Sequence, residues 1–223
     1  MAINCMNCNT IYIAVENGHP ECLKYLHKNG CELTKFLCCV AAESGNLECL
    51  KYVHENGCKI DGNTCTSAIE NGHLDCLKYI YENGYKFDED QIIIVAQFGN
   101  LDCLKYIHEK LNNFQFDNDI CNIVVRYGNL ECLKYLHENN CKWNSVTCET
   151  AAYFGQLECL KYLHENGCKW NKRTCTAAVK YGNLDCLKYS HENGCKWNNE
   201  TIIFARLNGY LDCLNYAIKN GCN

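Results

Sequence analysis

The chain has 223 residues, of which 48% are apolar and 21% charged, a balance typical of folded proteins that excludes an intrinsically disordered chain. The net charge of -5 is spread along the sequence without a basic stripe, which argues against nucleic acid as a partner. No apolar run approaches the roughly 20 residues that cross a bilayer, and residues 1–10 lack the basic start and apolar core of a secretion signal. We therefore expect no membrane association and a protein that stays in the compartment where it is made.

A recurring glycine organises the whole sequence. Its eight members are Gly18, Gly45, Gly72, Gly99, Gly128, Gly155, Gly182 and Gly209. Neighbouring members are 27 residues apart, except for one interval of 29 residues between Gly99 and Gly128. A fixed period of roughly 20 to 50 residues is typical of a solenoid, in which each repeat buries its apolar face only against its neighbours. We predict that residues 1–223 form a single array of eight repeats.

In chain order, each repeat glycine is followed by the longer of two predicted helices. In the sixth repeat this helix covers Leu157–His164, where the apolar residues fall at helical spacing. Glu158 and Lys161 are three residues apart and are placed to form an ion pair on the solvent side. The helix is predicted to end at Asn166-Gly167, because glycine readily adopts the left-handed conformation that closes a helix.

A shorter helix is predicted to follow, and one repeat position marks its start. That position holds only residues that favour the N-cap: Asn7, Thr34, Asp61, Asp88, Asp117, Asn144, Asn171 and Asn198. The residue before each cap is apolar and is paired with an Ile or Cys four positions after the cap, the pattern of a hydrophobic staple. Trp143, Trp170 and Trp197 occupy this position, so we interpret them as structural. The shorter helix runs to small residues such as Ala151-Ala152, which allow close helix packing.

The 22 cysteines would indicate a disulfide scaffold in a short secreted chain, but their spacing argues against one. Most recur at three repeat positions, and the second and third of these hold apolar residues in other repeats, for example Tyr85 and Ile92. The first position holds Cys22, Cys49, Cys76, Cys103, Cys132, Cys159, Cys186 and Cys213, the second Cys31, Cys58, Cys141, Cys168, Cys195 and Cys222, and the third Cys38, Cys65, Cys121, Cys148 and Cys175. We interpret them as small core hydrophobes with free thiols. Free thiols persist in a reducing cytosol, so we expect a cytoplasmic protein.

Two arrangements are candidates for metal binding. Six repeats carry a His at one position, and in five of them a Cys follows four residues later, as in His164 and Cys168. Tyr81 replaces this His in another repeat, which favours a structural role. The Cys5-x-x-Cys8 pair lacks a second ligand pair, although structural zinc needs four ligands. We expect no metal and no other cofactor, and a Cys/His-rich metal-binding protein is kept as an alternative.

Catalysis is not expected from this sequence. The polar residues outside the repeat pattern are too few to assemble a nucleophile, a base and an orienting group, and no phosphate-binding glycine motif occurs. We predict no catalytic residues and no enzymatic activity.

The segment 151–161, AAYFGQLECLK, resembles the ankyrin segment A-A-x-x-G-H-L-E-V-V-K, and Glu165–Cys168 is similar to its E-x-G-A ending. The match recurs in all eight repeats. Ordinary ankyrin repeats have about 33 residues and a T-P-L-H start, whereas here Thr147 stands where the Pro is expected. The residues missing from each repeat fall where the family has a β-hairpin finger. The resemblance implies an all-α, ankyrin-like solenoid of eight helix-turn-helix repeats, with the fingers reduced or absent.

The sequence motif L-E-C-L-K-Y-L-H-E-N-G-C-x-W is similar to the repeats of ankyrin proteins from giant viruses that infect amoebae. Some of those carry an F-box, which recruits a ubiquitin ligase, ahead of the array. Here the first repeat begins near Asn7, so we expect no F-box. The resemblance implies a non-catalytic scaffold for protein–protein interaction, with a host protein as the partner if the chain is viral. A substrate-recognition adaptor for a ubiquitin ligase is the alternative.

The predicted partner surface follows from the same resemblance. In ankyrin proteins the two residues before the repeat glycine line the concave face, and here repeats four to seven carry aromatic and basic residues at these positions. We predict that the binding residues are Phe98, Arg126, Tyr127, Tyr153, Phe154, Lys180 and Tyr181. Rings about 10 Å apart along the stack, beside basic side chains, have the composition of a protein-binding hot spot for an extended or acidic segment. Alternatively, the rings cover gaps left by the missing fingers.

Overall fold

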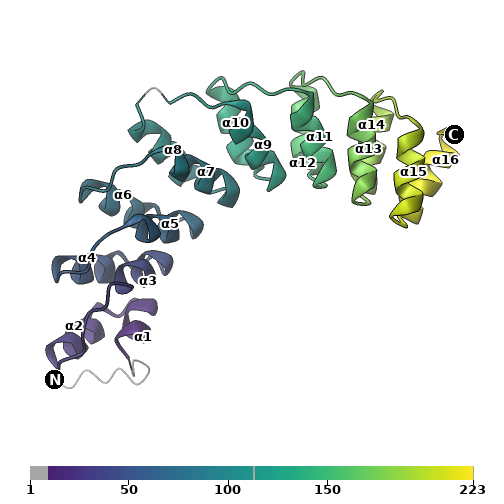
Figure 1. Ribbon diagram of the computed structural model, residues 1–223. Helices are drawn as coiled ribbons and strands as arrows, with labels where there is room; N and C mark the ends of the chain where they lie inside the picture. Colours follow the sequence, from purple (N-terminus) through teal and green to yellow (C-terminus); the bar gives the residue numbers. More distant parts are fainter. Residues whose placement is uncertain (1–9, 113, 223) are drawn as a thin grey trace. The chain divides into compact units, whose positions relative to one another are not determined.

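The computed structural model describes residues 10–112 and 114–222 and is built from pairs of short helices (Figure 1). Within these residues there are sixteen α-helices and no strand, which confirms the all-α prediction and the absence of β-hairpin fingers in this part of the chain. The odd-numbered helices, which precede the repeat glycines, are α1 (Ile11–Glu16), α3 (Leu37–Glu43), α5 (Gly62–Glu70), α7 (Glu89–Phe98), α9 (Asn118–Arg126), α11 (Ser145–Tyr153), α13 (Lys172–Lys180) and α15 (Asn199–Leu207). The even-numbered helices, which follow the glycines, are α2 (Pro20–Lys28), α4 (Leu47–Glu55), α6 (Leu74–Glu82), α8 (Leu101–Lys110), α10 (Leu130–Glu138), α12 (Leu157–Glu165), α14 (Leu184–Glu192) and α16 (Leu211–Lys219).

The predicted difference in helix length is wrong for most of the chain. From the third repeat onward the two helices of a repeat are equally long, for example 9 residues each in α11 and α12. The odd-numbered helix begins directly after its cap and continues through its small residues. Ala151 and Ala152 are fully buried in α11, so they serve close packing within the helix and do not shorten it.

The chain divides into two compact units, residues 1–112 and 113–223. The division falls in the one longer interval between repeat glycines. Within each unit, odd-numbered helices pack against the odd-numbered helices of neighbouring repeats and against their own even-numbered partner. In the second unit, α11 lies between α9 and α13, and α13 lies between α11 and α15. The single array over residues 1–223 stays a prediction.

Side-chain caps start most of the odd-numbered helices where the sequence predicts them. The side chains of Asp61, Asp88, Asp117, Asn144 and Asn171 each accept a hydrogen bond from a backbone N–H of the first turn. Thr147 completes a capping box with Asn144, which gives a role to the threonine that stands in place of proline. Each cap satisfies backbone donors that the helix itself leaves unpaired.

The cap prediction is wrong for Thr34 and holds only in part for Asn198. The N-cap of α3 is Phe36, because residues 35 and 36 form a turn and the Thr34 hydroxyl is hydrogen-bonded to that of Tyr12. Asn198 stands at the N-cap of α15 without a capping bond, since its side-chain oxygen accepts from Thr176 and its amide donates to Glu200. The predicted cap Asn7 lies outside the described residues.

Cysteines fill much of the core, as the sequence indicates. Cys49 and Cys159 are at most 1% exposed beside fully buried leucines, and burial raises the pKa of Cys49 to about 11 and that of Cys159 to about 12. A thiol in such a site is neutral and behaves as a small hydrophobe.

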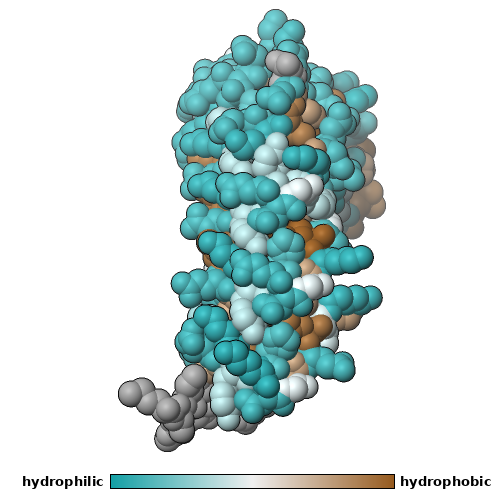
Figure 2. Space-filling model, turned by 90° about the vertical axis from the view of Figure 1, so that its left-hand side faces the viewer, coloured by the Kyte–Doolittle hydropathy of each residue, from teal (hydrophilic) through white to brown (hydrophobic). Residues whose placement is uncertain are grey.

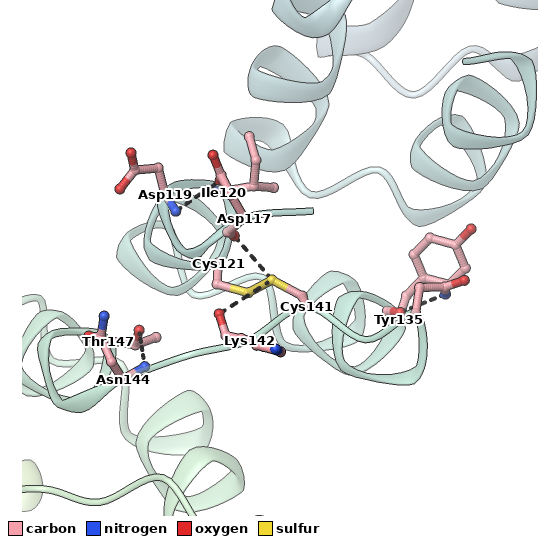
Figure 3. The surroundings of a disulfide bond; sticks show 10 residues. Asp117, Asp119, Ile120, Cys121, Tyr135, Cys141, Lys142, Asn144 and Thr147 are labelled. Carbon is pink, nitrogen blue, oxygen red and sulfur yellow. Dashed lines mark hydrogen bonds between the residues drawn. A yellow bond between two sulfur atoms is a disulfide. The ribbon is translucent and has the colours of Figure 1, made fainter. Parts of the chain in front are cut away.

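The prediction that all cysteines carry free thiols is wrong at three positions. Cys121 and Cys141 are joined by a disulfide (Figure 3), and Cys22 is disulfide-bonded as well. The recurrence of a cysteine at one repeat position does not show which other cysteine lies beside it. In the folded repeat, however, a cysteine in the first turn of the odd-numbered helix faces the loop that follows the even-numbered helix.

Aromatic side chains connect neighbouring repeats. The His164 Nδ1 atom and the Tyr189 hydroxyl of the next repeat lie 3.2 Å apart in a hydrogen bond, and the His164 ring stacks on Trp170 at 3.7 Å. The same His–Tyr bond joins four other pairs of repeats, at His27–Tyr52, His54–Tyr79, His137–Tyr162 and His191–Tyr216. The structural interpretation of the His and Trp positions is therefore confirmed, and the recurring Tyr takes part in the same contacts.

The outer faces of the even-numbered helices are polar. Lys161 and Glu158 form the predicted ion pair at 2.8 Å, and equivalent pairs lie on other even-numbered helices. The face drawn in Figure 2 is mainly hydrophilic, with pale and apolar residues confined to narrow strips. In the part of the chain that the structure describes, no helix has the length and apolarity to span a bilayer.

Candidate functional site

The predicted binding residues occupy the last turns of the odd-numbered helices. Six of the seven lie in the second unit: Arg126, Tyr127, Tyr153, Phe154, Lys180 and Tyr181. Each pair consists of the last residue of a helix and its C-cap, directly before the repeat glycine. We call these six residues the aromatic-basic surface. Because α9, α11 and α13 pack side by side, the three helix ends are neighbours.

Arg126 connects the first two repeats of this surface. Its guanidinium carbon lies 4.9 Å from the centroid of the Phe154 ring in the next repeat and 5.7 Å from that of the Tyr127 ring. Both distances are within the range of a cation–π interaction. The guanidinium is thereby held against aromatic rings, while Tyr127 and Phe154 remain 44% and 39% exposed.

Tyr153 connects the second repeat to the third. Its ring centroid lies 4.9 Å from that of Phe154 and 4.4 Å from that of Tyr181. A hydrogen bond with the nearby Tyr181 hydroxyl raises the pKa of Tyr153, so the Tyr153 phenol is neutral at physiological pH. Tyr181 is itself 57% exposed. The rings of Tyr153, Phe154 and Tyr181 therefore pack on one another and leave exposed area beside the basic groups.

A cavity of about 420 Å³ opens next to these rings, over α11, α13 and α15. Its lining includes three residues of the aromatic-basic surface, Tyr153, Phe154 and Lys180. The other lining residues are Val146, Glu149, Thr150, Arg173, Thr176, Ala177 and Glu200. This volume lies within the range of about 300 to 1,000 Å³ that is typical of ligand pockets.

The charges around the cavity are arranged asymmetrically. α13 contributes two cations, Arg173 near its start and Lys180 at its end, about 10 Å apart along the helix. Among the described residues, no carboxylate forms an ion pair with either. The carboxylates come from the flanking helices, and each already accepts a hydrogen bond from an asparagine amide, Glu149 at 3.0 Å and Glu200 at 3.2 Å. The cavity lining therefore carries two positive and two negative side chains, and its two positive charges lie together on α13.

The cavity residues in the first turns of the helices were not predicted from the sequence. Val146, Arg173 and Glu200 stand two residues after their caps, at a repeat position that differs in every one of these three repeats. That variation, in a repeat whose packing positions hardly change, was the available signal. The prediction considered only the positions before the repeat glycine.

Phe98 is the remaining predicted residue. It ends α7 in the first unit and is 42% exposed. The structure does not join it to the aromatic-basic surface, so its role in binding stays a prediction.

The histidine and cysteine positions do not form a metal site in the part of the chain that the structure describes. No group of three or more His, Cys, Asp and Glu side chains is arranged there to hold a metal ion. The predicted N and S ligands point to different partners. His164, for example, bonds to Tyr189, whereas the thiol of Cys168 donates to the Asn144 carbonyl at 3.2 Å.

Comparison with known proteins identifies the same repeat. A family model described as "Ankyrin repeats (3 copies)" matches residues 11–91 and 92–174. Among solved structures, the crystal structure of the human ASB11 ankyrin repeat domain is similar to this chain, with 17% sequence identity and a TM-score of 0.45. The match covers 84% of this chain and 85% of that one. No curated protein matches the sequence.

Proposed function

The chain belongs to the ankyrin-repeat family, whose repeats generally mediate protein–protein interaction, and from this premise we propose that its second unit binds an extended segment of a partner protein. The binding residues are those of the aromatic-basic surface together with Arg173 in the adjoining cavity. The chain acts as a non-catalytic scaffold, and the surface corresponds to the concave face of the array.

The observation that carries the proposal is the continuity of the aromatic-basic surface across three repeats. Arg126, Phe154, Tyr153 and Tyr181 contact one another in sequence, and the exposed rings adjoin the cavity. Aromatic and arginine side chains that are already held in place lose little conformational freedom on binding, which favours them as interaction hot spots.

The chemistry of the cavity favours an acidic side chain next to an apolar one. Arg173 and Lys180 provide two cations without a carboxylate partner among the described residues, and Tyr153 and Phe154 provide an aromatic wall. A glutamate or aspartate of the partner would pair with a cation on α13 while a neighbouring apolar side chain covers the rings. Such a segment is extended, because it must follow three parallel helix ends.

Selection from a displayed library of random linear peptides tests this proposal. We expect the purified chain to enrich peptides that carry Asp or Glu within a few residues of an aliphatic or aromatic residue. Arg173→Ala, and Phe154→Ala combined with Tyr181→Ala, should each weaken binding of the enriched peptides by about 10-fold or more, as hot-spot truncations do.

Tyr25→Ala is the matched control, because Tyr25 is 55% exposed but lies on the even-numbered helix α2 of the first unit. It should leave peptide binding unchanged, and all variants should keep the helical circular dichroism of the parent. The proposal fails if the library yields no enriched peptide, or if the enriched peptides bind the surface variants as tightly as the parent.

The source of the partner and the consequence of binding are further parts of the proposal. The likeness to ankyrin proteins of giant viruses supports a host protein of the cytoplasm as the partner. Affinity capture from a cytosolic extract distinguishes a simple scaffold from a ubiquitin-ligase adaptor, since only the adaptor should retain ubiquitin-ligase subunits along with the partner.

A further inference from the structure

In the second unit, three consecutive repeats each bring two cysteines together. One cysteine lies in the first turn of the odd-numbered helix, and we call it the inner cysteine; the other follows the even-numbered helix 20 residues later, and we call it the outer cysteine. The inner and outer cysteines are Cys121 and Cys141 in repeat five, Cys148 and Cys168 in repeat six, and Cys175 and Cys195 in repeat seven. Each pair lies within a single repeat.

The outer sulfur has the same place in all three pairs, and the pairs occur in two covalent states. In repeat five the sulfurs are bonded (Figure 3), whereas in repeat six the Cys148 thiol donates a hydrogen bond to the Cys168 sulfur at a sulfur–sulfur distance of 2.7 Å. The outer sulfur occupies the same place in both, 3.1 Å from the Asp117 carbonyl in repeat five and 3.2 Å from the Asn144 carbonyl in repeat six. Repeat six therefore holds a dithiol where repeat five holds a disulfide.

Repeat seven repeats the contact of the outer cysteine. The Cys195 thiol donates to the Asn171 carbonyl at 3.1 Å, and the Cys175 thiol lies 3.7 Å from the Cys195 carbonyl oxygen. In both dithiol repeats the hydrogen bond from the inner thiol lowers the pKa of the outer one, Cys168 or Cys195. The outer sulfur is thus the better nucleophile of each pair.

The outer sulfur is also the one nearer to solvent. Cys195 lines an open depression of about 630 Å³, together with Trp170, Lys196 and Trp197. Cys175 is fully buried on α13. A small reagent can therefore approach the pair of repeat seven from the outer cysteine.

We propose that Cys148 with Cys168, and Cys175 with Cys195, are redox-active pairs that form disulfides equivalent to Cys121–Cys141, so that oxidation closes the same cross-link in three consecutive repeats. The oxidant is a low-molecular-weight disulfide. The outer thiolate attacks one of its sulfurs, forming a mixed disulfide and releasing one thiolate. The inner thiol then loses its proton and attacks the outer sulfur, which releases the second thiolate. The protein pair gives up two electrons and two protons, and the reagent is reduced to two thiols.

Two other repeats serve as internal controls, because each has a single cysteine in these two places. In repeat three, Cys65 is at the inner position and Tyr85 replaces the outer cysteine. In repeat eight, Cys222 is at the outer position and Ile202 replaces the inner cysteine. These cysteines are buried like the paired ones, so they report thiol reactivity without a second thiol in the repeat.

The experiment equilibrates the purified full-length chain with mixtures of oxidised and reduced glutathione, traps the remaining thiols by alkylation and maps the peptides by mass spectrometry. With increasing oxidised glutathione, we expect Cys148–Cys168 and Cys175–Cys195 disulfides to appear, while Cys65 and Cys222 stay alkylated or carry one glutathione. The oxidised chain should also melt at a higher temperature than the reduced chain.

Cys168→Ser and Cys195→Ser each remove one outer cysteine. Each variant should lose one disulfide, leave the inner thiol of that repeat open to alkylation and reduce the rise in melting temperature on oxidation, with unchanged helical circular dichroism. The inference is overturned if the inner cysteines of repeats six and seven are alkylated to the same extent as Cys65 under conditions that keep Cys121–Cys141 closed. It is also overturned if the disulfides that form join different repeats.

Discussion

The junction between repeats six and seven can be tested at a single glycine. Gly155 has a φ of +72°, and a Cβ built on it would lie 2.7 Å from the Oδ1 atom of Asn183 in the next repeat. The Asn183 amide donates hydrogen bonds to two carbonyls at the end of α11, that of Ala152 at 3.0 Å and that of Tyr153 at 2.8 Å. Gly155 therefore combines a left-handed conformation with a close approach that holds two repeats together.

Gly155→Ala should lower the free energy of unfolding by about 3 to 4 kcal/mol. Of this, about 1 to 2 kcal/mol is the strain of a left-handed alanine. About 2 kcal/mol comes from the two Asn183 hydrogen bonds, at about 1 kcal/mol each, because the asparagine must move away from the new methyl group. Gly167→Ala is the matched control: its φ is +83°, but no atom lies within 4 Å of a Cβ there, so only the strain applies.

Urea unfolding followed by far-ultraviolet circular dichroism measures both variants. Gly155→Ala should lose about 2 kcal/mol more than Gly167→Ala. Combining Gly155→Ala with Asn183→Ala should cost less than the sum of the single changes, because both remove the same hydrogen bonds. Equal losses at the two glycines, together with additivity in the double variant, would refute this account of the junction.

Three further changes test the contacts that stabilise the repeats. Tyr162→Phe removes the hydroxyl that is hydrogen-bonded to His137 of the preceding repeat, and it should lower the free energy of urea unfolding by about 1 kcal/mol. Tyr25→Phe is the control, because no such histidine precedes Tyr25 among the described residues, and it should change the free energy of unfolding very little. Equal effects of the two changes would contradict this. Asp61→Ala removes a capping box and should cost about 1 to 2 kcal/mol, and unchanged unfolding would show that the cap is dispensable. Burial raises the pKa of Cys76 to about 11 and that of Cys103 to about 12, so both thiols stabilise the fold in their neutral form. This stabilisation is complete below the ordinary thiol pKa and decreases as pH rises from about 9 towards 12. The melting temperature under reducing conditions should therefore fall over that pH range, and it should fall less steeply in a variant with Val at these two positions.

Local and periodic features of the fold could be predicted from the sequence. The N-cap at Asn144 and the helix end at Asn166-Gly167 depend on backbone groups within a few residues, so the residue types alone indicate them. The core role of Cys159 follows from its recurrence at helical spacing. Where the prediction was wrong, a nearby contact intervened, as at Thr34, whose hydroxyl bonds to Tyr12.

The candidate site was predictable only in part. Positions before the repeat glycine, such as Phe154 and Tyr181, stand out because they vary between repeats. Arg173 varies as well, but its place beside those rings depends on how α13 packs against α11 and α15. A single sequence gives the spacing of residues within one helix and not the contacts made between helices.

By itself, then, the sequence determined the repeat, the two helices in each repeat and the starts of most of the odd-numbered helices. These features depend on hydrogen bonds and burial within one period of the chain. Only the tertiary structure decided which side chains of different helices meet: the bond from His164 to Tyr189, the contact of Arg126 with Phe154 and the pairing of Cys121 with Cys141. These contacts join residues 20 to 28 positions apart, and their distances are fixed by helix packing, which no local pattern encodes.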